Sequence, residues 1–195
     1  AEEAGWTLNA RGALGAVGEP PAPDLGEWPP AGAEPLEIAE LHERTAALGL
    51  DYGPAFQGAR AAWRRGEELF VEAELDPERA AEAAHFGLHP ALLDAAQQAL
   101  VLAEDADADG GPRVPFAWSG VRLHGSGSGA LRAVLRPRGR DDFSLALAGA
   151  DGRPLGSVRS FATRRADPAA LAGADPHRDS LFAIEWAAVE PAAGE

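Results

Sequence analysis

The chain has 195 residues, 46% of them hydrophobic, and is long enough for one good core or two small ones. Its net charge of -14 argues against nucleic acid and anionic membranes as partners, because both require a basic face on the protein. The absence of cysteine excludes disulfides, a thiolate nucleophile and cysteine-based metal sites. No apolar run reaches the roughly 20 residues that span a bilayer, and the first residues lack the basic start and apolar stretch of a signal peptide, so we expect a cytoplasmic protein.

The first 35 residues predict one isolated strand followed by a linker. Residues 6–14 alternate enough to form a strand, whereas residues 18–35 are dense in proline and glycine, which indicates an extended linker without regular structure. The sequence lacks methionine, at position 1 as elsewhere, and begins without a leader. We therefore expect a piece of a larger polypeptide, in which residues 1–35 end one domain and lead into the next.

The following stretch predicts a helix, a loop and a pair of strands. Residues 36–48 carry apolar side chains at helical spacing, and Gly49 then ends the helix. A loop shaped by glycine and proline, two strands around a turn and one helical turn come next, at residues 52–58, 59–65, 69–75 and 77–84. The second of these strands alternates apolar and charged residues, which is typical of a half-buried strand.

Residues 89–103 predict a long helix that is apolar on nearly every side, with Pro90 tolerated in its first turn. Such a helix is normally buried, yet it contains one carboxylate, that of Asp94. A buried carboxylate costs free energy unless it is paired, hydrogen-bonded or protonated. Gln98 lies four residues further along the same helix face, so its amide can hold Asp94. A buried, oriented acid is a candidate proton donor, although a capping or core-network carboxylate satisfies the same pattern.

The C-terminal part predicts mainly strands. The acidic, glycine-rich residues 104–112 indicate a solvated loop and not a cation site, because their carboxylates lack an ordered ligand pattern. Four strands follow, with a hairpin signal at Asp151 and Gly152, at residues 114–124, 131–136, 143–149 and 154–164. This order predicts an α+β fold in which a curved antiparallel sheet wraps around a single buried helix. Residues 167–179 are expected to form a second linker, and residues 181–186 the first strand of a domain that follows.

Three segments resemble motifs of one protein family: residues 52–58 read YGPAFQG, residues 89–98 read HPALLDAAQQ and residues 114–121 read VPFAWSGV. Their order and spacing resemble those in the C-terminal half of the dehydratase domain of modular type I polyketide synthases. That domain is a double hotdog, in which two hotdog folds are fused in one chain. The resemblance covers residues 36–166 and implies that they form the second hotdog, that residues 1–35 contain the end of the first hotdog and a linker, and that residues 167–195 lead to the next domain.

The family's reaction is the removal of water from a 3-hydroxyacyl chain on an acyl carrier protein, which gives a 2,3-enoyl thioester in polyketide biosynthesis. The resemblance implies that a histidine of the first hotdog takes the C2 proton and that Asp94 donates a proton to the departing hydroxyl. It also implies that Gln98 orients Asp94 and that Tyr52 points its hydroxyl toward the substrate hydroxyl or Asp94. The remaining family positions would line the substrate tunnel: Pro54, Phe56, Gly58, His89, Pro90, Phe116 and Trp118.

Structural alternatives stay open for several of these residues. Tyr52 could only pack and bond a backbone group, and Phe116 and Trp118 could belong to the core. His89 fits a helix N-terminus bonded to backbone better than a catalytic base. His85 and His89 have the spacing of a metal pair but lack a third ligand, so we expect no metal.

The family's catalytic base lies in an HxxxGxxxxP motif, and this sequence has none; the nearest candidate, His124, has Ser128 where glycine should stand. The chain is therefore expected to hold half of an active site and to be inactive alone. The implied partners are an acyl carrier protein with its phosphopantetheine-bound acyl chain, the upstream hotdog with its histidine, neighbouring synthase domains and a second copy in a homodimer. No cofactor of its own is expected. The rival functions are a dehydratase-like cyclase or isomerase and a non-catalytic hotdog that scaffolds the synthase or docks carrier protein.

Overall fold

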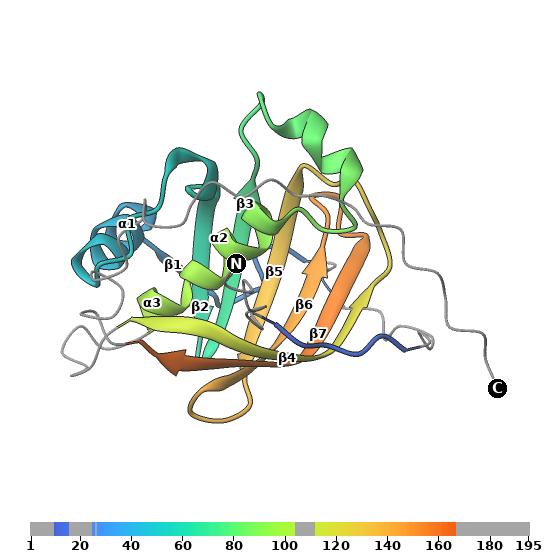
Figure 1. Ribbon diagram of the computed structural model, residues 1–195. Helices are drawn as coiled ribbons and strands as arrows, with labels where there is room; N and C mark the ends of the chain where they lie inside the picture. Colours follow the sequence, from blue (N-terminus) through green and yellow to red (C-terminus); the bar gives the residue numbers. More distant parts are fainter. Residues whose placement is uncertain (1–9, 16–24, 26, 104–111, 167–195) are drawn as a thin grey trace, which may run out of the picture.

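The computed structural model describes residues 10–15, 25, 27–103 and 112–166, which form one curved antiparallel sheet with helices on one face (Figure 1). The seven strands are ordered β1-β2-β3-β5-β6-β7-β4, so β1 and β4 are the edges. The strands are β1 Glu34–Leu36, β2 Ala59–Arg65, β3 Glu68–Glu74, β4 Arg113–Leu123, β5 Ala130–Pro137, β6 Asp142–Ala148 and β7 Pro154–Arg165. The helices are α1 Ile38–Ala47, the short 3₁₀ helices η1 Pro54–Phe56 and η2 Ala80–His85, and then α2 Pro90–Gln98 and α3 Leu100–Ala103.

The central helix α2 packs against the middle of the sheet, and Figure 1 shows it lying across the strands. Leu92, Ala95 and Ala96 have no exposed surface. The sequence predicts one helix over residues 89–103, but the structure divides it at Ala99 into α2 and α3. The Leu102 N–H donates to the carbonyl of Ala99, and such an i to i+3 bond tightens the chain at the point where α2 ends.

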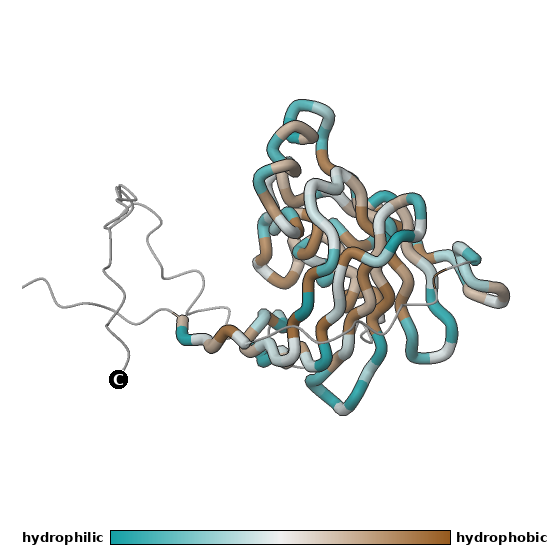
Figure 2. Tube along the Cα trace, turned by 90° about the vertical axis from the view of Figure 1, so that its right-hand side faces the viewer, coloured by the Kyte–Doolittle hydropathy of each residue, from teal (hydrophilic) through white to brown (hydrophobic). Residues whose placement is uncertain are grey.

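Two layers of apolar side chains use opposite faces of the sheet. The inner core joins α2 to the sheet and to α1 through residues such as Leu41, Val71 and Leu135. A smaller outer cluster contains Phe70 and Val134. Because successive strand residues point to opposite faces, the adjacent pair Phe70 and Val71 serves both layers. Figure 2 shows the hydrophobic segments gathered in the sheet and its helices and the hydrophilic ones in the connections.

A segment before β1 covers the outer cluster; we call Leu25 and residues 27–33 the strap. Leu25 is buried, and the Trp28 ring lies edge-on to Trp63 and Phe70, with centroids 6.1 and 5.8 Å away. The prediction of a linker without regular structure over residues 18–35 is wrong at residues 34 and 35, which begin β1, whereas Leu25 and residues 27–33 form no helix or strand. The composition misled because Pro35 is compatible with an edge strand, where a missing N–H breaks no ladder.

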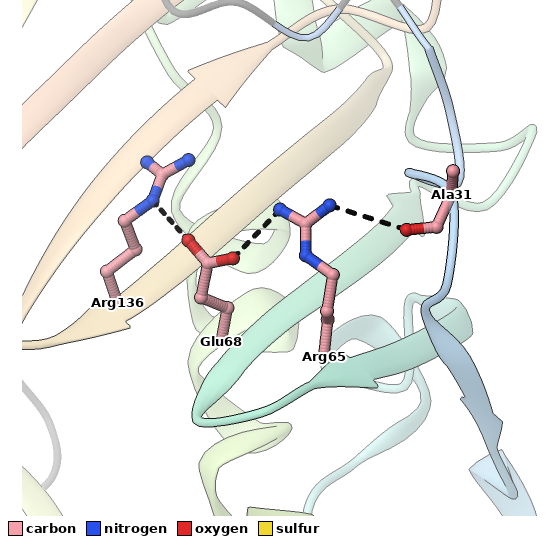
Figure 3. Close-up of polar contacts among 4 residues, drawn as sticks. All are labelled: Ala31, Arg65, Glu68 and Arg136. Atoms are coloured by element: carbon pink, nitrogen blue, oxygen red, sulfur yellow. Dashed lines mark hydrogen bonds and ion pairs between the residues drawn. The ribbon is translucent and has the colours of Figure 1, made fainter.

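A chain of polar contacts ties the strap to the sheet (Figure 3). Glu68 accepts hydrogen bonds from Arg136, at 2.6 Å, and from Arg65, at 2.9 Å, and Arg65 also donates to the Ala31 carbonyl at 3.5 Å. Burial opposes ionisation of Glu68, but the two guanidinium groups outweigh it and hold the pKa of Glu68 below its ordinary value. These contacts join β2, β3, β5 and the strap.

The other predicted strands are confirmed within one or two residues at each end, and the hairpin signal at Asp151 and Gly152 is confirmed by a turn in which Gly152 has a φ of +79°. The helix predicted at residues 36–48 corresponds to α1, and the helical turn at 77–84 to η2. The predicted strand at residues 6–14 is wrong for residues 10–14, which have no regular structure; its first residues, the 104–111 loop and residues 167–195 lie outside the described residues.

Candidate functional site

Asp94 lies in the middle of α2 and is half-buried. The spacing prediction is confirmed: the Gln98 side-chain amide donates a hydrogen bond of 2.8 Å from Nε2 to the Asp94 carboxylate. Desolvation by the apolar helix and sheet raises the pKa of Asp94, and the bond from Gln98 only partly opposes this shift. The position therefore favours a protonated carboxyl group, as a general acid requires.

Gln98 also connects α2 to the loop that precedes β2. It is 5% exposed, and its Nε2 donates a second bond of 3.0 Å to the Phe56 carbonyl. A carbonyl can only accept, so this bond fixes which end of the amide faces the loop and Asp94. Asp94 is consequently held by Gln98, whose amide is in turn anchored to the Phe56 carbonyl.

The loop of residues 52–58 closes on itself around η1. The Phe56 N–H donates to the Gly53 carbonyl at 2.9 Å, and the Gln57 side chain donates to the Tyr52 carbonyl at 2.8 Å. Gly58 then enters β2 so close to β3 that an added Cβ would lie 2.8 Å from the Glu74 carbonyl oxygen. These contacts give Tyr52 a fixed place although it lies in no helix or strand.

Tyr52 is the second ionisable group beside Asp94. Burial, together with the negative charge of Asp94, raises the pKa of Tyr52 to about 12. The hydroxyl therefore stays protonated at neutral pH and can donate a hydrogen bond. Both side chains lie close enough for their charges to interact, and both line one pocket.

This pocket has a cavity volume of about 30 Å³ and is partly open to solvent. Asp94, Tyr52 and Gln98 form part of its wall. The rest exposes mostly apolar surface, from residues such as Leu50, Val101 and Phe161, but also includes the polar Arg113, Thr45, Gln97 and Thr163. A carboxyl group and a phenol beside apolar walls suit a substrate that has a polar reacting centre on a hydrocarbon chain. The arrangement can donate a proton to an oxygen atom held there.

The other predicted site residues do not line this pocket. His89 is the N-cap of α2: its Nδ1 accepts the Ala91 N–H at 3.2 Å, which confirms the backbone-bonded interpretation. Pro90 occupies the first turn of α2 and is exposed. The side chains of Phe116 and Trp118 are exposed on β4, by 62% and 38%, so their assignment to the core is wrong. Pro54 and Phe56 shape the loop beside the pocket and do not line it, and Gly58 follows them.

Among the described residues, no group of three or more His, Asp or Glu side chains is placed to hold a metal ion. No helix of the described ranges has both the length and the apolar character needed to cross a bilayer.

Two features of the site have no sequence signal. The Gln57 side chain reaches back five residues to a carbonyl, and Gln98 bonds a carbonyl 42 residues earlier in the chain. A backbone carbonyl is present at every residue, so sequence shows neither contact. The helical i to i+4 spacing, in contrast, revealed the pair formed by Asp94 and Gln98.

Comparisons with known proteins agree on one family. Residues 20–173 match the family model described as "Polyketide synthase dehydratase N-terminal domain". The spectinabilin polyketide synthase system protein NorA' of Streptomyces orinoci is 47% identical over 187 residues, which are 95% of this chain and 5% of that protein. The pikromycin polyketide synthase component PikAII of Streptomyces venezuelae is 46% identical over 200 residues, 98% of this chain and 5% of that protein.

Solved structures give the same picture. A structure reported for dehydratase substrate selection in the borrelidin and fluvirucin polyketide synthases aligns with a TM-score of 0.71 and 42% identity, over 77% of this chain and 53% of that one. The dehydratase domain of the terminal rifamycin synthase module aligns with a TM-score of 0.65 and 36% identity, over 80% and 54%. A bifunctional dehydratase-cyclase domain from ambruticin biosynthesis aligns with a TM-score of 0.63 and 43% identity, over 71% and 49%. The chain thus spans about half the length of these solved domains.

Proposed function

Since the chain belongs to the polyketide synthase dehydratase family, we propose that it supplies the acid-bearing half of an active site that removes water from a 3-hydroxyacyl chain on an acyl carrier protein. The product is a 2,3-enoyl thioester. The proposal rests chiefly on Asp94, a carboxyl group with a raised pKa that Gln98 holds beside an apolar pocket. The apolar wall suits the acyl chain, and the carboxyl group suits the departing hydroxyl.

In the proposed reaction, Asp94 gives its proton to the oxygen on C3 as the C3–O bond breaks. Hydroxide is a poor leaving group, so protonation at this oxygen lowers the barrier. A general base takes the C2 proton, and the electrons of the C2–H bond form the double bond. Tyr52, which stays protonated, donates a hydrogen bond to the same oxygen and orients it toward Asp94.

The base comes from a second hotdog in this proposal. His89 is the histidine of the HPALLD segment, but its Nδ1 lone pair already accepts the Ala91 N–H, so the other ring nitrogen carries the proton in the neutral ring. The Nδ1 atom thus already has a backbone partner, and His89 does not line the pocket that contains Asp94. We assign the base to a histidine of an upstream hotdog, which makes this chain the C-terminal half although the matching family description names an N-terminal domain. An upstream coding sequence with a histidine followed by glycine at +4 and proline at +9 would support this order.

The decisive variant is Asp94→Asn in the intact dehydratase domain. Asparagine keeps the size and can still accept the Gln98 bond, but it has no acidic proton, so dehydration should fall by at least about 100-fold. Mass spectrometry of a 3-hydroxyacyl carrier-protein thioester measures the loss of water. Asp51→Asn is the matched control, because Asp51 is an exposed carboxylate outside the pocket. Normal turnover by Asp94→Asn would remove Asp94 from the mechanism.

A second candidate is cyclisation at the same site. It is favoured by the similarity to the ambruticin domain, which is described as a dehydratase-cyclase. In a cyclase, a hydroxyl further along the acyl chain would add to C3 of the enoyl product. Chromatographic separation of the enoyl and cyclic products, with a substrate carrying such a hydroxyl, distinguishes the two activities. Folded protein that forms neither product would favour a non-catalytic scaffold.

A further inference from the structure

We propose that Gln57 is a positioning residue for the dehydration proposed above, because it holds Tyr52 in place beside Asp94. The inference rests on that proposed function and adds a residue to it. Gln57 does not line the pocket and its side chain bond lies in an exposed region, so it acts through its neighbours and not on substrate.

The connection begins at the acid. Gln98 donates to both Asp94 and the Phe56 carbonyl, at 2.8 and 3.0 Å, which ties the end of the loop to α2. Gln57 follows Phe56 directly, and its Nε2 donates to the Tyr52 carbonyl at 2.8 Å. The two glutamines therefore link the acid to the phenol through the loop between them, with the η1 backbone as the rigid connection.

The start of the loop depends on this closure. Tyr52 lies outside any helix or strand and is followed by Gly53, the residue type that restricts the backbone least. The tyrosine hydroxyl is at the far end of a long side chain, so a small rotation at its Cα moves that oxygen by more than a hydrogen bond tolerates. A single bond from Gln57 across the loop mouth removes much of that freedom.

The chemistry of the bond suggests a discriminating variant. Gln57→Glu keeps the shape of the side chain but replaces the N–H donor with an acceptor, which is repelled by the Tyr52 carbonyl oxygen. Gln57→Lys keeps a donor of similar reach. Since the side chain is exposed, neither change should shift the melting temperature of the domain by more than about 2 °C.

The experiment measures kcat and KM for carrier-protein-bound substrate with the intact dehydratase domain. We expect Gln57→Glu to lower kcat roughly tenfold with little change in KM, and Gln57→Lys to recover most of the loss. In a Tyr52→Phe background, which has no hydroxyl to position, Gln57→Glu should cause no further loss. Glu67→Gln, in the exposed turn between β2 and β3, is the control and should resemble the wild type.

Two results would overturn the inference alone. The first is full activity of Gln57→Glu while the wild-type domain dehydrates the substrate. The second is a double variant in which the separate losses of kcat from Gln57→Glu and Tyr52→Phe multiply, as for independent residues. A folded wild-type domain that releases no water would instead overturn the proposed function, and the role of Gln57 with it.

Discussion

At the scale of single residues, Asp94 shows how one side chain opposes the burial that surrounds it. Its carboxyl group would ionise freely in water, but the apolar environment raises its pKa and the Gln98 amide compensates only in part. Keeping an acid protonated near neutral pH is what general acid catalysis requires. The same desolvation makes the ionised form costly to the fold, so the proposed function and the stability make opposite demands on Asp94.

This opposition predicts a pH dependence for Asp94→Asn. A carboxyl group whose pKa is raised by folding destabilises the protein once the pH exceeds its pKa in the unfolded chain, and the effect is absent below that value. Asp94→Asn should therefore raise the melting temperature at pH 7 and leave it unchanged near pH 3, by differential scanning calorimetry of the intact domain. In the wild type, kcat should decline as the pH rises through the raised pKa. A larger stabilisation at the lower pH would contradict the assigned cause.

Gly58 is a residue whose side chain would have no room. An added Cβ would lie 2.8 Å from the backbone oxygen of Glu74, and a backbone atom of the β2–β3 pair cannot rotate away as a side chain can. We predict that Gly58→Ala lowers the free energy of unfolding by about 1–3 kcal/mol, measured by urea denaturation. Gly139→Ala is the matched control, since nothing lies within 4 Å of its Cβ position and its φ is not positive, and it should change the stability by less than about 0.5 kcal/mol. If Gly58→Ala and Gly139→Ala changed the stability equally, the contact of the added Cβ with the Glu74 oxygen would cost little free energy.

At the scale of elements, local periodicity in the sequence was sufficient to predict a strand or helix wherever that element had one buried face. The alternation in β3 and the apolar spacing of α1 and α2 each gave the element and its approximate ends. The division of the central helix at Ala99 escaped prediction, because no glycine or proline marks it and an i to i+3 bond accompanies it there. Sequence periodicity reports burial and not the detailed pattern of backbone hydrogen bonds.

The strap escaped prediction for a different reason. Proline and glycine explain its lack of helix and of long strands. The burial of Leu25 and the partial burial of Trp28 depend on an outer face of the sheet that only the tertiary structure creates. In the site, likewise, the helical pair was predictable and the loop closure by Gln57 was not. Contacts that depend on spacing within one element can be read from sequence, whereas contacts between elements cannot.

The strap should contribute measurably to stability. Trp28 contacts Trp63 and Phe70 edge-on, and the Arg132 guanidinium lies 5.5 Å from its ring centroid. Since Trp28 is only partly buried, we predict that Trp28→Ala costs about 2 kcal/mol of unfolding free energy, measured by chemical denaturation. Leu14→Ala removes a fully exposed apolar side chain and should be neutral. An unchanged stability of Trp28→Ala would mean that the strap lies on the sheet without stabilising it.

At the scale of the whole molecule, β4 is a long edge strand with exposed apolar side chains. It is an eleven-residue edge strand that pairs with β7, and within the described residues nothing pairs with its other edge. Its exposed side chains include Trp118, Val121 and Leu123, each at least 38% exposed. Long apolar edges are normally covered or blunted, because they invite pairing with other chains. The chain also spans only about half the length of the solved dehydratases that it resembles.

Hydrogen exchange tests whether the proposed upstream hotdog covers β4. If an upstream hotdog packs along this strand, the β4 amides that point away from β7 should exchange slowly in the intact domain and much faster in the isolated chain, as measured by mass spectrometry. The amides of β5 are the internal control, because β5 pairs with β3 and β6 on its two edges and should be protected in both samples. Equally fast exchange of β4 in the two samples, with β5 protected, would show that the second half docks elsewhere. Arg113 and Pro115 of β4 line the pocket, so an upstream hotdog that docks elsewhere would not reach the pocket at this wall. The proposed base would then have to approach Asp94 from another side.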